Sequence, residues 1–180
     1  MEIEETALAG AVILTPARHQ DSRGFFSESW SKKAMAAAGF EYDFVQDNHS
    51  MSHASNTLRG LHYQEPPHGQ VKLVRCGQGS FFDVAVDIRR GSPTYGHWIG
   101  VELSAKNGKQ LLIPEGFLHG FVTRTPDTEV IYKCSRSYAP AADGAVHWDS
   151  CGIEWGLKAL PLLSDKDAIA PRLSDFESPF

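Results

Sequence analysis

The feature that most constrains how this chain can fold is a two-residue repeat of side-chain type over residues 80–88. Two alternating sets make up the repeat, one of Phe82, Val84, Val86 and Ile88 and the other of Phe81, Asp83, Ala85 and Asp87. Successive side chains of a β-strand point to opposite faces of its sheet, so this alternation predicts a strand. An α-helix would repeat about every 3.6 residues and is excluded here.

Shorter segments of the same kind follow from residue 70 onward, at residues 71–76, 98–103, 110–113, 121–124 and 129–135. Turn sequences rich in Gly, Pro, Ser or Asn lie between them, at residues 77–79, 91–93 and 105–108. Many short strands joined by turns are typical of a sandwich or a barrel, so we expect an all-β fold.

Helical signals are few. Residues 32–38 are rich in Ala and Lys, Ser31 is suited to cap the start of a short helix, and Gly39 is suited to the left-handed conformation that ends one. After Trp155 the chain carries three prolines and little periodicity, so we expect coil and short helices packed on the barrel.

Composition limits the kinds of protein that this chain can be. A length of 180 residues predicts one domain, and 17 basic against 22 acidic side chains leave a net charge of −5, too acidic for a broad nucleic-acid surface. The cysteines Cys76, Cys134 and Cys151 are odd in number and lack C-x-x-C spacing, which predicts buried free thiols. The apolar residues 7–14 lack a basic leader, so we expect a soluble, cytoplasmic protein that does not enter a membrane.

Two segments place polar side chains beside glycines, as a lined cavity requires: R-G-L-H-Y-Q at residues 59–64 and P-E-G-F-L-H-G at residues 114–120. The second matches the P-x-G-x-x-H half of the cupin pattern, which belongs to jelly-roll barrels. Metal-dependent cupins add an H-x-H pair and a carboxylate, whereas His62 is followed by Tyr63 and Gln64. His62 and His119 alone are too few ligands for a metal, which leaves His62 free to act as a base.

Eight segments, in this order over almost the whole chain, resemble the dTDP-4-dehydrorhamnose 3,5-epimerase family. They are D-S-R-G-F-F-S-E (21–28), V-Q-D-N-H-S (45–50), L-R-G-L-H-Y-Q (58–64), Q-V-K-L-V-R-C (70–76), D-V-A-V-D-I-R (83–89), S-P-T-Y-G (92–96), I-P-E-G-F-L-H-G-F (113–121) and L-S-D-K-D-A (163–168). The resemblance implies a cupin-like jelly roll with its core at about residues 45–155, within a single domain of residues 1–180.

The resemblance also implies the reaction. The substrate is dTDP-4-dehydro-6-deoxy-D-glucose, whose C3 and C5 hydrogens both flank the C4 ketone, so removing either leaves an enolate. Inversion to dTDP-4-dehydro-L-rhamnose then needs a base and an acid on opposite faces of the ring. His62 corresponds to the family's base and Tyr132 to its acid, and no cofactor is expected.

Two further residues complete the implied catalytic set. Asp167 matches the family's position for the carboxylate that orients the base, a role that sequence separation alone cannot assign. Lys72 corresponds to the cation that stabilises the enolate. Its strand position agrees, because Lys72 falls on the same face as Val74 and Cys76 and is therefore expected to point inward. Tyr132 alternates with Val130 and Cys134 in the same way.

Substrate-binding residues follow from the same matches. Arg23, Arg59 and Lys166 correspond to contacts with the diphosphate and nucleotide, His119 to a neighbour of the sugar, and Tyr138 to a ring stacked on thymine. Polar contacts are expected from Glu28, Gln46, Asn48 and Asp143, the last standing where relatives often have Glu. Family members form homodimers whose N-terminal segments cross to the partner, so Arg23 and Glu28 are candidates to serve the neighbouring site.

Three alternatives remain at this point. A relative that inverts only C3 or only C5 would carry the same motifs. A metal-dependent cupin oxygenase would share the barrel but would contain bound iron or manganese. A barrel that binds sugar nucleotides without turnover would not need His62, Asp167, Lys72 and Tyr132 together.

Overall fold

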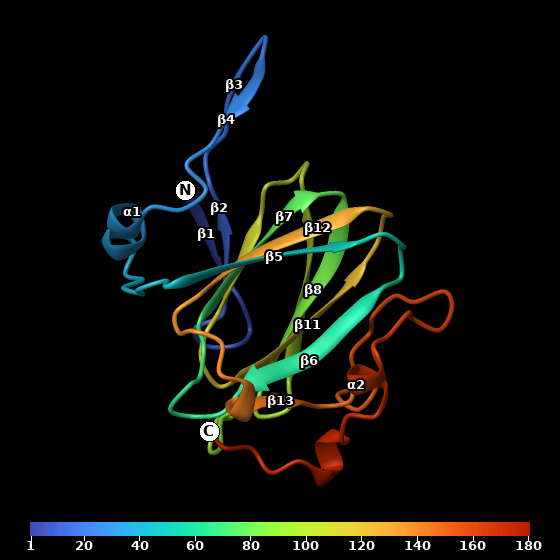
Figure 1. Ribbon diagram of the computed structural model, residues 1–180. Helices are drawn as coiled ribbons and strands as arrows, with labels where there is room; N and C mark the ends of the chain where they lie inside the picture. The colour runs from blue at the N-terminus through green and yellow to red at the C-terminus, as the bar shows by residue number, and fades with distance from the viewer.

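Two antiparallel sheets face each other in the computed structural model, which describes residues 1–180 (Figure 1). The six-stranded sheet has the order β1 (Glu2–Glu5), β2 (Val12–Thr15), β10 (Gln110–Ile113), β7 (Lys72–Gln78), β12 (Thr128–Cys134) and β5 (Gln46–Ser52). The five-stranded sheet has the order β13 (Asp143–Ala145), β6 (Leu58–Gln64), β11 (Phe117–Thr123), β8 (Ser80–Asp87) and β9 (Trp98–Ser104). The expected all-β, cupin-like jelly roll is therefore confirmed.

The other elements lie outside the two sheets. A hairpin of β3 (His19–Asp21) and β4 (Gly24–Phe26) projects away from the barrel, and helix α1 (Lys32–Ala37) follows it (Figure 1). Short helical turns η1 (Pro140–Ala142), α2 (Asp165–Ala168) and η2 (Leu173–Asp175) occupy the C-terminal part. The predicted ends of helix α1 are confirmed. The Ser31 hydroxyl accepts from the Ala34 N–H, and Gly39 has the left-handed conformation, with a φ of 88°.

The strand predictions need three corrections. No strand was expected at β3, β4, β5, β6 or β13. The expected strand at 121–124 begins at Phe117, because residues 117–123 pair along their whole length with β8. The expected core of residues 45–155 omits β1 and β2, which extend the six-stranded sheet through pairing of β2 with β10. The four-residue length of β1 and β2 is too short for a clear period, and burial of Val12, Ile13 and Leu14 supplies the missing stabilisation.

Strand β8 divides the apolar core into two layers, as its alternation predicts. Phe81 and Ala85 belong to the cluster between the two sheets, with residues such as Val74, Val130 and Phe121. Val84, Val86 and Ile88 belong to a second cluster, on which the C-terminal segment packs through Trp155. Both faces of the five-stranded sheet are therefore covered, and polar side chains on its inner face need a local reason to be there.

The three cysteines are buried and unpaired, as expected. No helix of the chain has both the length and the apolar character needed to cross a membrane.

Candidate active site

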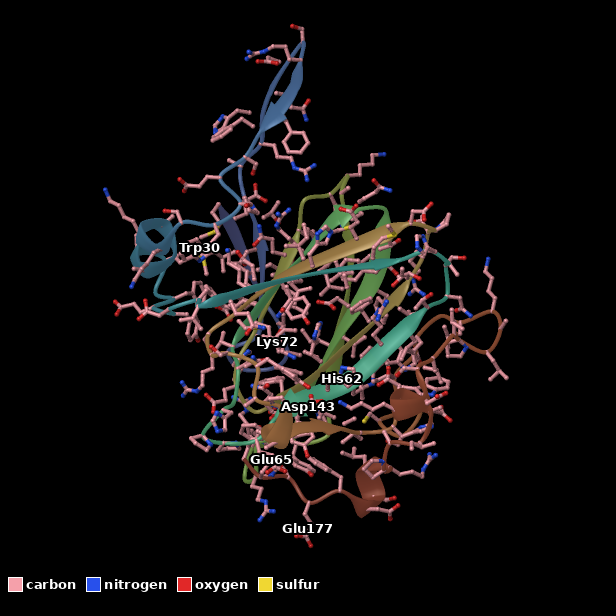
Figure 2. All side chains as sticks on the ribbon, viewed as in Figure 1. Trp30, His62, Glu65, Lys72, Asp143 and Glu177 are labelled. Carbon is pink, nitrogen blue, oxygen red and sulfur yellow. The ribbon has the colours of Figure 1, made fainter.

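Two adjoining cavities lie inside the barrel and share His62, Lys72 and Tyr132 in their walls. The Asp167 cavity has a volume of about 510 Å³ and also contacts Arg59, His119, Phe121, Leu162, Leu163, Ser164 and Asp167. The Tyr138 cavity has a volume of about 410 Å³ and also contacts Gln46, Asn48, Tyr63, Gln64, Gln70, Tyr138, Asp143 and Lys166. Figure 2 shows His62, Lys72 and Asp143 together at the lower end of the barrel.

A β-bulge in β6 places two site residues on one face. His62 pairs with His119 and Arg59 pairs with Phe121, so residues 59–62 of β6 lie opposite only residues 119–121 of β11. Gly60 makes the bulge possible: its φ is 120°, and a Cβ there would lie 2.6 Å from the Gly120 Cα. Arg59 and His62, three residues apart, therefore both face the Asp167 cavity.

His62 and Asp167 form a close pair. Asp167 Oδ1 lies 2.6 Å from His62 Nε2, while Oδ2 accepts from the Gly60 N–H at 3.4 Å. The carboxylate belongs to α2, whose first turn is capped by Ser164. Burial acts to raise the pKa of Asp167, but the hydrogen bonds from His62, Ser164 and Gly60 outweigh it and hold that pKa below its usual value. An ionised Asp167 can orient the imidazole, whose Nδ1 has no partner in the chain.

Lys72 points inward from β7, as the strand pattern predicts, and lies in the walls of both cavities. Burial lowers its pKa below the usual value, and the acidic groups Cys134, Asp143 and Asp83 offset this only in part. No carboxylate forms an ion pair with its Nζ. A cation at a cavity wall that no carboxylate contacts directly is available for a developing negative charge.

His119 faces His62 from the neighbouring strand β11, and it is almost wholly buried. Its Nε2 lies 2.7 Å from Oδ1 of Asp83 on β8. Burial lowers the pKa of His119 despite the Asp83 charge, so a neutral imidazole is favoured at neutral pH.

Tyr132 projects from β12 between the two cavities, with its ring edge toward His119 at a centroid distance of 6.3 Å. Burial raises the pKa of Tyr132, and Cys134 and Asp143 add to that effect while Arg59 opposes it. The phenol is therefore held in its protonated form, as a general acid requires.

The Tyr138 cavity brings five expected substrate contacts together. The Gln46 side chain links two of them, because its Oε1 accepts from the Tyr138 N–H and its Nε2 donates to Asn48. Asp143 forms an ion pair with Lys166 and accepts from the Tyr138 hydroxyl at 3.4 Å. Tyr138 keeps 55% of its surface exposed, which leaves its ring accessible for stacking.

Three predicted residues lie elsewhere. Arg59 faces the Asp167 cavity, not the Tyr138 cavity, and donates to Ser52 and to the Met51 carbonyl at 3.3 Å. Arg23 and Glu28 border neither cavity. Arg23 sits in the projecting hairpin, where its guanidinium pairs with Asp21 and stays 87% exposed.

Sequence reasoning missed one buried residue of this site, Asp83, although its strand pattern held the signal. Asp83 falls on the same face of β8 as Phe81 and Ala85, which are core residues. A carboxylate on such a face needs a partner, and the register of β8 with β11 supplies His119.

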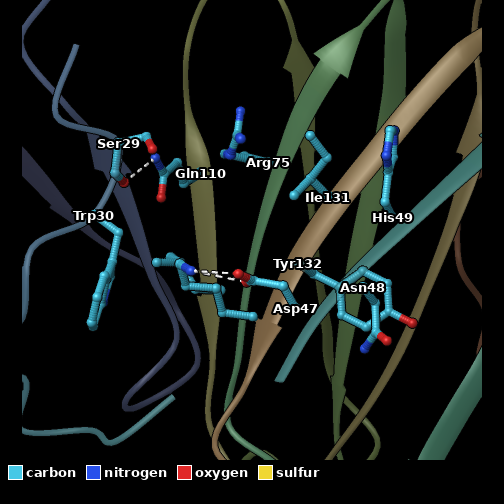
Figure 3. Close-up of a pocket in the computed structure, with 11 residues that line it drawn as sticks. Ser29, Trp30, Asp47, Asn48, His49, Arg75, Gln110, Ile131 and Tyr132 are labelled. Carbon is cyan, nitrogen blue, oxygen red and sulfur yellow. Dashed lines mark hydrogen bonds and ion pairs between the residues drawn. The ribbon is translucent and has the colours of Figure 1, made fainter. Parts of the chain in front are cut away.

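A further cavity of about 200 Å³ lies mainly on the outer face of the six-stranded sheet (Figure 3). Leu73, Arg75 and Ile131 line it beside the ion pair of Lys133 with Asp47. Asn48 and Tyr132 also border this cavity, but His62, Lys72 and Asp167 do not, so it is not the candidate site. No group of three or more His, Cys, Asp or Glu side chains is placed to hold a metal ion.

Comparisons with known proteins agree with this geometry. The family model described as dTDP-4-dehydrorhamnose 3,5-epimerase matches residues 5–175. A curated dTDP-4-dehydrorhamnose 3,5-epimerase from Salmonella typhimurium is 50% identical over 176 residues, which is 96% of each chain. The crystal structure of a Bacillus anthracis enzyme of that name, with TDP and PPi bound, is 45% identical with a TM-score of 0.93 and covers 96% of this chain and 99% of its own.

A third match is the Legionella pneumophila dTDP-6-deoxy-D-glucose-3,5-epimerase in complex with dTDP-4-keto-L-rhamnose. It is 42% identical with a TM-score of 0.92, and the match covers 98% of this chain and 94% of the Legionella chain. The family model and the relatives span nearly the full length. The chain therefore belongs to the dTDP-4-dehydrorhamnose 3,5-epimerase family, as an isomerase that inverts a dTDP-4-keto-6-deoxy sugar at C3 and C5.

Proposed function

We propose that this chain epimerises dTDP-4-dehydro-6-deoxy-D-glucose at C3 and C5 with His62 as the base, Tyr132 as the acid and no cofactor. The observation that carries the proposal is the 2.6 Å His62–Asp167 contact in a cavity wall shared with Lys72 and Tyr132. With Nε2–H donated to Asp167, the Nδ1 lone pair of His62 accepts the proton from carbon.

Each inversion is a balanced transfer of one proton out and one proton in. The C–H electron pair moves into the ring as the enolate of the C4 ketone, and the Lys72 ammonium stabilises the oxygen. Tyr132 then delivers its hydroxyl proton to the opposite face of the carbon. The phenolate regains a proton from solvent and His62 releases its own to solvent, so the enzyme returns to its starting state. The same groups then act on the second carbon, because both carbons flank one ketone.

The nucleotide end of the substrate fits the Tyr138 cavity. Tyr138 offers an exposed ring for thymine, and Lys166 offers a cation for the diphosphate, supported by Arg59 at the adjoining wall. We propose that His119 contacts the sugar, while Gln46, Asn48 and Asp143 make or support polar contacts with the nucleotide.

The test of the overall reaction is NMR of dTDP-4-keto-6-deoxyglucose in deuterated water with chelator-treated protein. We expect deuterium at both C3 and C5 and formation of the L-rhamno product. Exchange at only one carbon would identify a single-position epimerase. Binding without exchange would contradict catalysis by these residues, and activity restored only by iron or manganese would contradict the cofactor-free reaction.

Tyr132→Phe is expected to separate proton removal from inversion. The variant keeps His62 and Lys72, so deuterium still enters by return through the base, while the yield of inverted product falls by about 100-fold or more because the acid is missing. Product and exchange are measured in one NMR time course, with Tyr95→Phe, outside both cavities, as the control. An unimpaired yield of inverted product would remove Tyr132 from the acid role.

We further propose that residues 1–180 form one domain that acts as a homodimer in the cytoplasm, with the β3–β4 hairpin completing the partner's site. Arg23 and Glu28 match family substrate contacts, yet they border neither the Asp167 cavity nor the Tyr138 cavity of their own chain. Phe25 and Phe26 on the same hairpin are 57% and 71% exposed. Contact with a second copy would bury both rings and bring Arg23 to a diphosphate. Unpaired thiols suit the reducing cytoplasm.

Mixed dimers test this arrangement. Arg23→Ala and His62→Ala chains, co-expressed with different tags and purified as heterodimers, are expected to show about half the wild-type activity, since one of two sites is intact. A His62→Ala with Lys72→Met heterodimer is the control and has no intact site. If the hairpin served its own chain, the first heterodimer would be as inactive as the control, and a monomer by size-exclusion chromatography would also reject the proposal.

A further inference from the structure

We propose that Asp83 is a positioning residue of this epimerase, which holds His119 as a hydrogen-bond acceptor for a sugar hydroxyl and balances the charge of Lys72. The inference rests on the roles proposed above for Lys72 and His119. Asp83 begins D-V-A-V-D-I-R (83–89), one of the segments matched to the family, but no role in the site was assigned to it from the sequence.

The geometry is a diagonal pair across two strands of the five-stranded sheet. Asp83 of β8 pairs in register with Phe121, and its carboxylate reaches back to His119, two residues earlier on β11. Asp83 is completely buried, and His119 is 7% exposed at the wall of the Asp167 cavity. The Asp83 carboxylate therefore acts on the substrate only through His119 and through its charge.

One oxygen of Asp83 has no hydrogen-bond partner. Oδ2 is buried and unpaired, whereas Oδ1 contacts His119 Nε2 at 2.7 Å. Asp87 provides a contrast on the same strand and face: it is equally buried, but Arg89, Ser92 and Thr94 donate to its two oxygens at 2.6–2.9 Å. These hydrogen bonds are enough to explain why Asp87 is stable in a buried position, with no need of a role in the site. An apolar residue would cost less than the half-paired Asp83, which indicates that its negative charge serves the site.

Asp83 determines which nitrogen of His119 meets the substrate. When its carboxylate accepts from Nε2–H, the neutral ring presents Nδ1 as an acceptor. Nδ1 has no protein partner, and it is not among the two buried side-chain atoms left unpaired, which are Trp30 Nε1 and Asp83 Oδ2. It therefore opens into the cavity. A sugar hydroxyl fits this acceptor, while the ketone oxygen, itself an acceptor, is left to the Lys72 ammonium.

Charge balance is the second effect. The groups that face Lys72 come from every surrounding strand, namely Tyr132 and Cys134 on β12, His62 on β6, His119 on β11, Asp83 on β8 and Asp143 on β13. Asp83 is the fully buried carboxylate among them, and its charge raises the pKa of Lys72 against the lowering effect of burial, though by less than Cys134 and Asp143 do. Burial raises the pKa of Asp83 itself, while the contact with His119 and the charge of Lys72 favour its ionised form. Removing that charge lets the pKa of Lys72 fall further, so the amine loses its proton at a lower pH.

The first test reads the tautomer of His119 directly. Long-range ¹H–¹⁵N spectra of histidine-labelled, ligand-free protein are recorded from about pH 6 to about pH 9, with His119→Asn used for assignment. We expect a neutral ring protonated at Nε2 over the whole range. A ring protonated at Nδ1, or an imidazolium, would overturn the proposal, and no substitution at Asp83 is needed to reach that result.

The second test is Asp83→Asn. We expect kcat to fall by roughly 10- to 100-fold with little change in KM, and the high-pH limb of the kcat profile to move to lower pH, since Lys72 must be charged to act. Asp87→Asn is the matched control. We expect its Tm to fall while the high-pH limb of its kcat profile stays at the wild-type position. If the high-pH limb of the kcat profile of Asp83→Asn did not move, Asp83 would have only a structural role and the proposal would be rejected.

The two failures are distinguishable. If wild-type protein binds thymidine diphosphate but exchanges no sugar proton, the proposed function fails, whatever the His119 spectrum shows. The alternative is that proton exchange is normal but the His119 ring is protonated at Nδ1, or the high-pH limb of the Asp83→Asn kcat profile does not move. In that case only the proposed role of Asp83 fails.

Discussion

Replacing His62 with alanine is expected to abolish deuterium incorporation at both C3 and C5 while leaving the affinity for dTDP nearly unchanged. His62 is the base for both carbons in the proposed reaction, and a positioned base contributes about 10²- to 10⁴-fold to rate. Loss at both positions together is the informative result, because two separate bases would be affected independently. The measurement is the exchange of each sugar proton by NMR, with dTDP binding followed by calorimetry.

His53→Ala is the matched control for this variant. His53 also contacts an aspartate, Asp127, at 3.1 Å, but it is 83% exposed and borders neither cavity. We expect its exchange rates to equal those of the wild type. Persistent exchange at either carbon in His62→Ala would show that another group removes that proton.

Lys72→Met is expected to slow exchange at C3 and C5 by a common factor, on the order of 10²- to 10³-fold. Methionine keeps the length and much of the apolar stem of lysine but removes the charge that stabilises the enolate. Both exchange steps pass through an enolate at the same C4 oxygen, so a common factor is the expected signature. Exchange rates at saturating substrate separate this effect from weaker binding.

Lys133→Met serves as its control on the neighbouring strand. Lys133 pairs in register with Leu73, beside Lys72, but its ammonium lies on the outer face and binds Asp47 at 2.8 Å. Removal of this charge is expected to leave exchange unchanged. A Lys72→Met variant that altered only KM would assign Lys72 to binding, and a different factor at each carbon would argue against one shared oxyanion site.

The strands that sequence predicted well are those whose two faces meet different surroundings. In β8 the inward and outward sets enter separate apolar clusters, so the period is visible in the residues themselves. β6 was recognised as a cavity segment but not as a strand, because the bulge at Gly60 interrupts its period. β1 and β2 were not predicted because a strand of four residues is too short to show a two-residue period. They form strands because β2 pairs with the distant β10 and β1 pairs with β2.

Some site residues could be predicted from the local strand pattern, whereas others depend on contacts that only the folded chain makes. The inward direction of Lys72 and Tyr132 follows from alternation along β7 and β12. The choice of Asp167 over Asp165 required family resemblance, since more than a hundred residues separate it from His62 and only the folded chain brings α2 to β6. Asp83 was visible as a carboxylate on an apolar strand face, but its partner His119 depends on the register between β8 and β11.

The bulge in β6 has a consequence for protein engineering. Gly60 and Gly120 face each other across β6 and β11: a Cβ on Gly60 would lie 2.6 Å from the Gly120 Cα, and one on Gly120 would lie 2.9 Å from the Arg59 carbonyl oxygen. These contacts are with backbone, which cannot swing aside as a flexible side chain does. Libraries that diversify this barrel toward other keto sugars therefore have to keep both glycines and draw their variation from apolar wall residues such as Leu162 and Leu163.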